Sequence, residues 1–141
     1  MFYEQRMAAP ESPAALRREY DDELSRLVAS RGLEEAAAAT GIDADRLEAL
    51  GDGDVPDLAL EEAAEIQALG DGEPDPETIV EIACEHLLLG MSTAILDVDS
   101  LANAVEADLD AKEIQQKIER RAPMTFDEYV HLQYAIADEP R

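Results

Sequence analysis

Apolar side chains recur every three or four residues along most of this chain, and no stretch alternates apolar with polar residues. The spacing is that of one face of an α-helix, whereas a half-buried strand would alternate. The clearest case is a predicted helix that starts at Ser12 and Pro13, a cap followed by a proline, and ends at Gly32. Its apolar residues are Leu16, Tyr20, Leu24, Leu27 and Val28. The pattern predicts an all-α fold.

Capping residues, glycines and prolines divide the chain into segments. The boundaries predict an N-terminal tail over residues 1–10, a first helical unit over 11–70, a linker over 71–76, a central apolar helix over 77–96 and a second helical unit over 97–141. In the second unit, Asp110 with Glu113 and Thr125 with Glu128 have the spacing of capping boxes. A length of 141 residues suits one compact domain built from these segments.

The predicted central helix carries apolar residues on nearly all of its faces. Leu87, Leu88 and Leu89 are consecutive, so they point in three directions about 100° apart, and one neighbouring helix cannot cover them all. We expect this helix to lie between the two units or between two subunits. The predicted interface residues, which would also serve a homodimer, are Leu87, Leu88, Leu89 and Met91.

Acidic residues outnumber basic ones by 34 to 11, which leaves a net charge of −23. At ordinary ionic strength this charge opposes a compact fold. At about 1 M salt the Debye length falls to roughly 3 Å, and a dense carboxylate surface then repels itself little. Lysine is scarce, with Lys112 and Lys117 alone, and alanine is abundant. The composition is typical of proteins from extremely halophilic archaea and favours adaptation to salt over a specific cation-binding or DNA-mimicking role.

Signals for export, membrane insertion and catalysis are missing from the sequence. The N-terminus lacks the basic-then-apolar order of a signal peptide, and Cys84 is the only cysteine. Cys84 and His86 point to different faces of a helix and His131 lies far along the chain, so no metal-ligand set is expected. No glycine-rich phosphate loop or nucleophile motif is present. We expect a cytoplasmic protein without a membrane anchor that is not an enzyme and needs no cofactor, metal or small-molecule substrate.

The two helical units share an internal repeat. A shift of 65 residues before the turn and of 67 after it superposes their apolar and capping positions, so the second copy has two extra residues in its turn. The equivalent pairs are Ala37 and Ala102 at the first shift, and Ile42 and Leu109, Asp43 and Asp110, Leu47 and Ile114, Pro56 and Pro123, Glu61 and Glu128, and Leu69 and Ile136 at the second.

Residues 33–53 hold a small residue near the end of one short helix, a tight turn, two apolar positions on the next helix and a closing glycine. These elements are Ala37, the turn Thr40-Gly41-Ile42, Leu47 with Leu50, and Gly53. The arrangement resembles the helix-turn-helix of the lambda-repressor-like family, and a weaker version recurs in the second copy. The resemblance implies two short helices at a steep angle, the second of which reads DNA. The whole chain also resembles a small, uncharacterised family of acidic haloarchaeal proteins.

The positions that would face DNA differ between the two copies. The first copy offers mainly carboxylates there, from Asp43, Asp45 and Glu48 beside Arg46, and carboxylates repel phosphate. The second copy offers cations that neutralise phosphates and amides that pair with base edges. These candidate nucleic-acid or polyanion contacts are Lys112, Gln115, Gln116, Lys117, Arg120 and Arg121. The competing interpretation is a solvated helix face with ion pairs such as Glu113 with Lys117.

Two hypotheses of function follow from the sequence. The first is a helix-turn-helix protein of a halophile that acts as a transcription regulator and contacts DNA through its second unit. The alternative is a protein-interaction or homodimerisation module that keeps the helix-turn-helix shape without binding DNA. Pairing of the second unit's cations with carboxylates would favour the alternative.

Removal of salt is expected to unfold the protein, because a net charge of −23 then loses its screening. Circular dichroism in a dilute buffer without added salt measures this directly. Full helicity under those conditions would show that halophilic adaptation does not explain the acidity.

Overall fold

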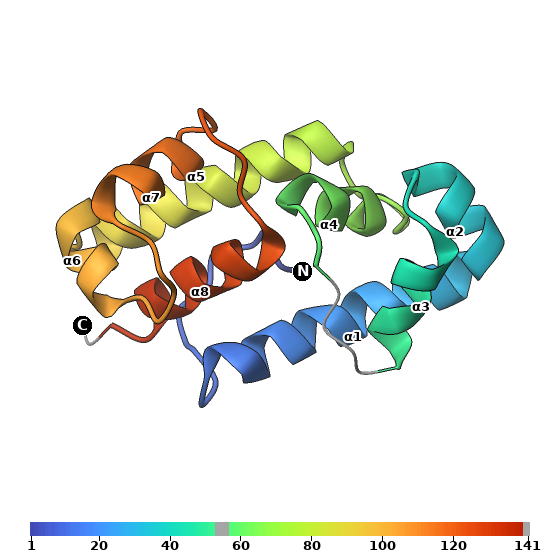
Figure 1. Ribbon diagram of the computed structural model, residues 1–141, viewed down its shortest axis with the longest axis horizontal. Helices are drawn as coiled ribbons and strands as arrows, with labels where there is room; N and C mark the ends of the chain where they lie inside the picture. Colours follow the sequence, from blue (N-terminus) through green and yellow to red (C-terminus); the bar gives the residue numbers. More distant parts are fainter. Residues whose placement is uncertain (53–56, 140–141) are drawn as a thin grey trace.

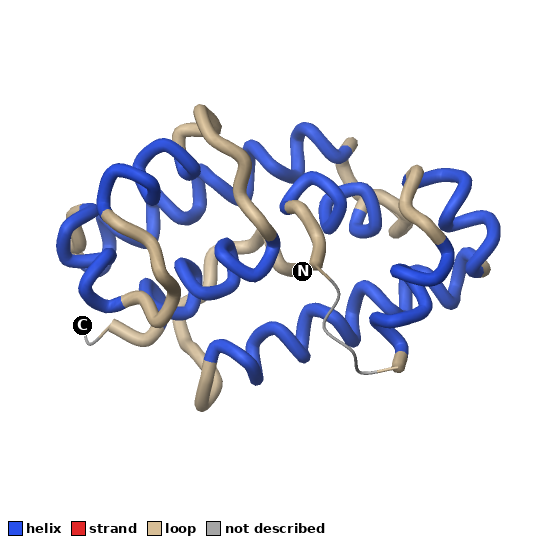
Figure 2. The backbone as a smooth tube through the Cα atoms, viewed as in Figure 1, coloured by secondary structure: helices blue, strands red, loops and turns tan. Residues whose placement is uncertain are grey.

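The computed structural model describes residues 1–52 and 57–139, which form two halves of four helices each. The first half holds α1 (Pro13–Arg31), α2 (Leu33–Thr40), α3 (Ala44–Gly51) and α4 (Leu60–Gln67); the second holds α5 (Pro76–Ala94), α6 (Val98–Ala104), α7 (Ala111–Ile118) and α8 (Phe126–Ala137). In Figure 1, α1 and α5 run along opposite sides of the molecule, α4 and α8 lie between them, and the pairs α2–α3 and α6–α7 occupy opposite ends. The predicted all-α fold is confirmed, since helices and loops account for the described residues (Figure 2) apart from one isolated bridge.

The two long helices, α1 and α5, share their start and their buried positions. Each has 19 residues and begins at a proline. Ser12 Oγ accepts the N–H of Ala15 at 3.0 Å, and Asp75 Oδ1 accepts that of Thr78 at 2.8 Å. When the two helices are aligned at a shift of 63 residues, each buried residue of α1 is equivalent to a buried residue of α5. The pairs are Leu16 and Ile79, Arg17 and Val80, Tyr20 and Ala83, Asp21 and Cys84, Leu24 and Leu87, and Val28 and Met91. The repeat therefore includes the long helices as well as the short ones.

Two backbone hydrogen bonds join the halves where α4 and α8 begin. The N–H of Leu60 donates to the carbonyl of Met124 at 3.0 Å, and the N–H of Phe126 donates to the carbonyl of Leu58 at 2.8 Å. At a shift of 66 residues, Leu60 is equivalent to Phe126 and Leu58 to Met124. Each half therefore donates and accepts the same hydrogen bond. Such a contact satisfies two backbone groups at each helix start that would otherwise be buried without a partner.

The glutamates that accept the N-cap N–H groups at these two helix starts also correct the predicted repeat. Glu62 Oε1 accepts the N–H of Ala59 at 2.9 Å, and Glu128 Oε1 accepts that of Thr125 at 2.9 Å. The pairing of Glu61 with Glu128 at a shift of 67 is therefore wrong by one residue. The connection to the last helix is one residue shorter in the second half, and two adjacent carboxylates in the sequence could not reveal which of them caps the helix.

The turn between α2 and α3 lies where the sequence predicts it. Gly41 ends α2 with a φ of 75°, a conformation that suits glycine. The fully buried alanine of α2 is Ala36, whereas the predicted Ala37 is only partly buried. Asp43 occupies the N-cap position of α3, but its side chain makes no capping hydrogen bond. The predicted closing residues Gly53 and Pro56 lie outside the described residues.

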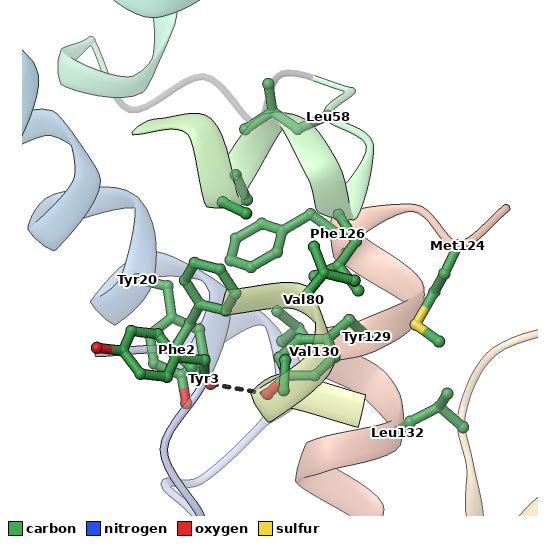
Figure 3. Close-up of a cluster of buried hydrophobic side chains, with 14 of the residues drawn as sticks. Phe2, Tyr3, Tyr20, Leu58, Val80, Met124, Phe126, Tyr129, Val130 and Leu132 are labelled. Carbon is green, nitrogen blue, oxygen red and sulfur yellow. Dashed lines mark hydrogen bonds between the residues drawn. The ribbon is translucent and has the colours of Figure 1, made fainter. Parts of the chain in front are cut away.

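An aromatic cluster around Phe2 forms the middle of the core (Figure 3). The Phe2 ring is fully buried and meets the rings of Phe126 and Tyr129 edge-on, with centroids 5.1 and 5.8 Å away. Tyr3 is also buried. The prediction of a tail over residues 1–10 is therefore wrong for Phe2 and Tyr3. The opening segment has no helical repeat of apolar residues that would have marked these two side chains as part of the core.

A buried hydrogen-bond network holds this N-terminal segment in place. Gln133 Nε2 donates to the Phe2 carbonyl at 3.0 Å and to the Tyr129 hydroxyl at 3.1 Å, and Tyr129 itself donates to the Phe2 carbonyl at 2.8 Å. Tyr20 donates to Gln133 Oε1. Burial raises the pKa of Tyr20 to about 12 and also raises that of Tyr129, so both hydroxyls stay protonated and can donate. Each buried polar group in the network therefore has a partner.

Helix α5 packs against α4, α7 and α8 and so connects the two halves. It packs tightly against α8 at Gly90, where an added Cβ would lie 2.8 Å from Ile136 Cγ2. Among the described residues no single helix is both long and apolar enough to cross a membrane, and α5 meets that criterion only together with α6, to which it is bent by 93°.

Gly90→Ala is expected to lower the free energy of unfolding by about 1 kcal/mol. Overpacking against the stiff Ile136 side chain outweighs the gain of about 1 kcal/mol that alanine normally brings to a helix interior. The matched control is Gly51→Ala, whose methyl group meets only Ser25 Oγ, at 3.2 Å. Denaturant titration of both variants at one salt concentration gives the comparison. Equal stabilisation by both changes would contradict the close packing of α5 on α8.

Candidate functional site

The six predicted contact residues of the second half separate into two groups. Lys112, Gln115 and Gln116 lie on the outward face of α7, opposite its buried residues Ile114 and Ile118. The helix begins at a complete capping box, as predicted. Lys112 is exposed and has no ion-pair or hydrogen-bond partner within residues 1–52 and 57–139. Gln115 Nε2 donates to Glu119 Oε2 at 3.2 Å, so a carboxylate accompanies this face.

The other three, Lys117, Arg120 and Arg121, are turned toward the junction of the two halves. Lys117 Nζ donates to Glu128 Oε1 and to the Pro123 carbonyl, each at 2.9 Å, and its side chain is largely covered. Burial raises the pKa of Glu128, but the hydrogen bonds from Lys117 and Thr125 together lower it by more, so the net shift is downward. Lys117 is therefore committed to holding the start of α8.

Arg120 and Arg121 follow the end of α7. The N–H of Arg121 donates to the Gln116 carbonyl at 2.8 Å, and that of Arg120 donates to the Lys117 carbonyl at 3.1 Å. These two bonds form a Schellman motif in which Arg120, with a φ of 63°, takes the position where glycine is usual. Arg120 Nη1 lies 3.6 Å from Glu81 Oε1, and Arg121 Nη2 lies 2.5 Å from Glu119 Oε1. Each arginine thus has a carboxylate beside it.

These three cations line a cavity of about 330 Å³ at the junction of the two halves. Its apolar wall comes from α4 and α5 and from the residue before the α8 cap: Leu60, Val80, Cys84 and Met124. Burial raises the pKa of the Cys84 thiol to about 11, although Arg120 lowers it and Glu61 adds a smaller rise. The cavity therefore has a neutral, apolar floor and a largely basic rim.

The equivalent helix of the first half has no such basic face. Arg46 donates to both oxygens of Glu62, at 2.7 and 2.8 Å, and the hydrogen bond with Arg46 is the main cause that lowers the pKa of Glu62. The remaining outward charges of α3 are the exposed Asp43, Asp45 and Glu48. The acidic character predicted for this face is confirmed.

The predicted interface residues of α5 also separate. Leu87 and Met91 are buried in the core of the chain, which fits a position between the two units rather than a contact with a second subunit. Leu88 and Leu89 have exposed fractions of 49% and 50%. Leu87 and Met91 are four positions apart, which puts both on the inner side of the helix, whereas Leu88 and Leu89 are rotated away from it.

Ile95 is a surface residue that the sequence did not single out. It follows the last residue of α5, has an exposed fraction of 91% and a φ of 56°. The sequence predicted a helix running to Leu96, which would have made Ile95 an interior helix residue. The capping role of Asp97, whose side chain accepts the N–H of Ser100, was the available sign that α5 ends earlier. We call Leu88, Leu89 and Ile95 the α5 apolar surface.

Metal-ligating side chains do not gather within the described residues, where no group of three or more His, Cys, Asp and Glu could hold a metal ion. His86 Nδ1 lies 2.7 Å from the Tyr3 carbonyl, and His131 Nδ1 lies 2.8 Å from the Asp127 carbonyl. Both histidines therefore contact backbone carbonyls, from half-buried positions.

Comparison with known proteins gives one match. No curated protein and no solved structure matches the chain. Residues 16–139 match a family described as a family of unknown function, DUF5791, so the match runs from the first half through the second. The chain belongs to the DUF5791 family.

Proposed function

We propose that this protein is a self-associating interaction module, in which two copies join through the α5 apolar surface, and that it works by binding rather than by catalysis. The observation that carries the proposal is Ile95, an apolar side chain that is almost fully exposed in a backbone conformation unfavourable to it. The proposal corresponds to the second of the two functions that the sequence suggests.

Ile95 is costly to the isolated chain in two ways. A left-handed conformation costs a non-glycine residue roughly 1–2 kcal/mol, and a β-branched residue is especially disfavoured there. Because the side chain is exposed, no burial of apolar surface offsets this conformational cost. At the shift of 63 that aligns α1 with α5, the equivalent residue is Gly32, which ends α1 with a φ of 99°. The first half therefore uses a glycine where the second half has an isoleucine, and coverage by a partner would compensate for the difference.

A second copy of this chain is the partner that best suits the α5 apolar surface. Residues 87–96 contain no acidic or basic residue, although the chain as a whole has a net charge of −23. A basic partner or a cation would be attracted to the acidic surfaces rather than to this one. A second copy presents the same neutral surface, and an isologous contact about a two-fold axis brings Leu88 and Leu89 of both copies together.

DNA binding through the outward face of α7 is the second candidate, and it follows from the helix-turn-helix resemblance. Lys112 supports it, because this exposed cation has no partner among the described residues. Lys117, Arg120 and Arg121 count against it, because Lys117 is held by Glu128 and the two arginines line the cavity at the junction of the halves, away from the outward face of α7. A single free lysine neutralises few phosphates, and phosphate neutralisation supplies most of the non-specific affinity for DNA.

Ile95→Gly is expected to act in opposite directions on folding and on association. It raises the free energy of unfolding of the monomer by about 1 kcal/mol, because glycine adopts the left-handed conformation without strain. It weakens the dimer tenfold or more, because burial of an isoleucine contributes about 1.5–3 kcal/mol. Denaturant titration at low protein concentration and sedimentation equilibrium at high concentration measure the two effects.

Leu88→Glu provides an independent test of the same surface and should leave a folded monomer. Met7→Glu is its matched control, since it also puts a carboxylate at an exposed apolar position, outside α5. Wild-type protein that stays monomeric at every concentration, or a dimer unaffected by Ile95→Gly and Leu88→Glu, would disprove the proposed contact.

DNA retention at the cell's own salt concentration decides between the two candidates. Wild type, Lys112→Glu and Arg46→Glu are expected to retain equally little DNA, because a self-association module contacts DNA through neither α7 nor α3. Retention by wild type and Arg46→Glu that is lost in Lys112→Glu would instead support DNA binding through α7.

A further inference from the structure

We propose that the cavity between the two halves binds a small organic anion, whose acidic head group contacts Arg120 and Arg121 and whose apolar part lies against Leu60, Val80 and Met124. The proposal does not depend on self-association, since the cavity lies within one chain and Leu88, Leu89 and Ile95 do not line it. Its volume of about 330 Å³ is at the small end of the range for ligand sites.

Cations are concentrated in the lining of the cavity, in a protein that is strongly acidic overall. Three of its lining residues are Lys117, Arg120 and Arg121, whereas Glu61 is the one acidic residue among the described residues that lines it. Only 11 of the 141 residues are lysine or arginine, against 34 acidic ones. An accumulation of cations at one concave site therefore stands out from the remaining surface. Concave sites of one charge attract ligands of the opposite charge.

The carboxylates beside the two arginines leave them able to bind a ligand. Arg120 Nη1 and Glu81 Oε1 are 3.6 Å apart, beyond the usual length of a hydrogen bond, and both side chains are substantially exposed. Arg121 contacts Glu119 through a single nitrogen, Nη2, and is 61% exposed. A guanidinium carries five N–H donors, so each arginine keeps donors for a second acceptor. Exposed ion pairs of this kind are weak and exchange readily.

The backbone at Arg120 gives a separate reason to assign it a role. Arg120 takes the left-handed position of the Schellman motif, which glycine normally occupies. At the shift of 67 that aligns α3 with α7, the sequence places Arg120 opposite Gly53. The second half therefore has an arginine where the first has a glycine, although glycine would fit this conformation without strain. The long contact with Glu81 offsets little of that strain. Charge-assisted hydrogen bonds to a bound anion would offset much more of it.

The apolar wall narrows the class of ligand. Leu60, Val80 and Met124 line the cavity with only 2–4% of their surface exposed, and the Cys84 thiol beside them is neutral. An inorganic ion would contact the arginines alone. An aryl or short alkyl group that carries a phosphate or a carboxylate would cover the wall and reach the arginines together.

Titration of the full chain with phenyl phosphate tests the proposal, with inorganic phosphate, benzoate and phenol as comparison probes at constant ionic strength. Isothermal titration calorimetry is expected to show saturable binding of phenyl phosphate, and at least tenfold weaker binding of phenol and of inorganic phosphate. Comparison of benzoate with phenyl phosphate shows which head group the site prefers. Arg120→Gly should abolish binding while leaving the protein as stable as wild type or more so. Arg26→Gln removes one exposed positive charge from α1 and should leave binding unchanged.

Three results would overturn the proposal. The first is no saturable binding of phenyl phosphate or benzoate, and the second is binding that Arg120→Gly does not weaken. The third is equal loss in Arg120→Gly and Arg26→Gln, because a general charge effect would then explain the binding. Equal affinity for inorganic phosphate and phenyl phosphate would refute the assigned role of the apolar wall.

Discussion

The reciprocal pair of backbone hydrogen bonds between residues 58–60 and 124–126 is the contact on which the rest of the structure depends. It fixes where α4 and α8 begin, because each helix start supplies a partner to the chain segment before the other. Phe126 is the first residue of α8, so the same contact delivers its ring to the aromatic cluster around Phe2. Helix α8 then packs against α1, α4, α5 and α6. The core is shared between the halves, and neither half encloses it alone.

Against this common plan, the two halves differ most where their helices end. Gly32 ends α1, whereas its equivalent after α5 is Ile95; in the sequence, Gly53 stands opposite Arg120. In each case the second half carries a side chain in a backbone conformation that favours glycine. Packing explains what the halves have in common, since their buried positions coincide. It does not explain these two residues, because both are exposed. Strained residues of this kind often serve binding, and they are the basis of both surfaces proposed for this protein.

The charge of the second half shows why a count of residues could not decide between DNA binding and self-association. The sequence places four cations within ten positions, from Lys112 to Arg121. The fold turns Lys117 inward to the cap of α8 and brings Glu81 from α5 beside Arg120. Glu81 is 39 residues away in the chain, so its position could not be foreseen from local spacing. Of these four cations, Lys112 is the one that lies exposed on the outward face of α7 with no partner among the described residues.

The sequence by itself determined the helices, most of their caps and the repeat of the short helices, because helix periodicity and capping are set by residues at most a few positions apart. It also identified the basic residues of the cavity, though as an outward DNA-binding face. Only the tertiary structure decided that Phe2 enters the core, that Leu87 and Leu88 have opposite exposures, and that the last helices align at a shift of 66. It likewise placed the charged pair Arg17 and Asp21 in buried positions. These features depend on contacts between residues far apart in the chain, and such contacts leave no periodic signal in the sequence.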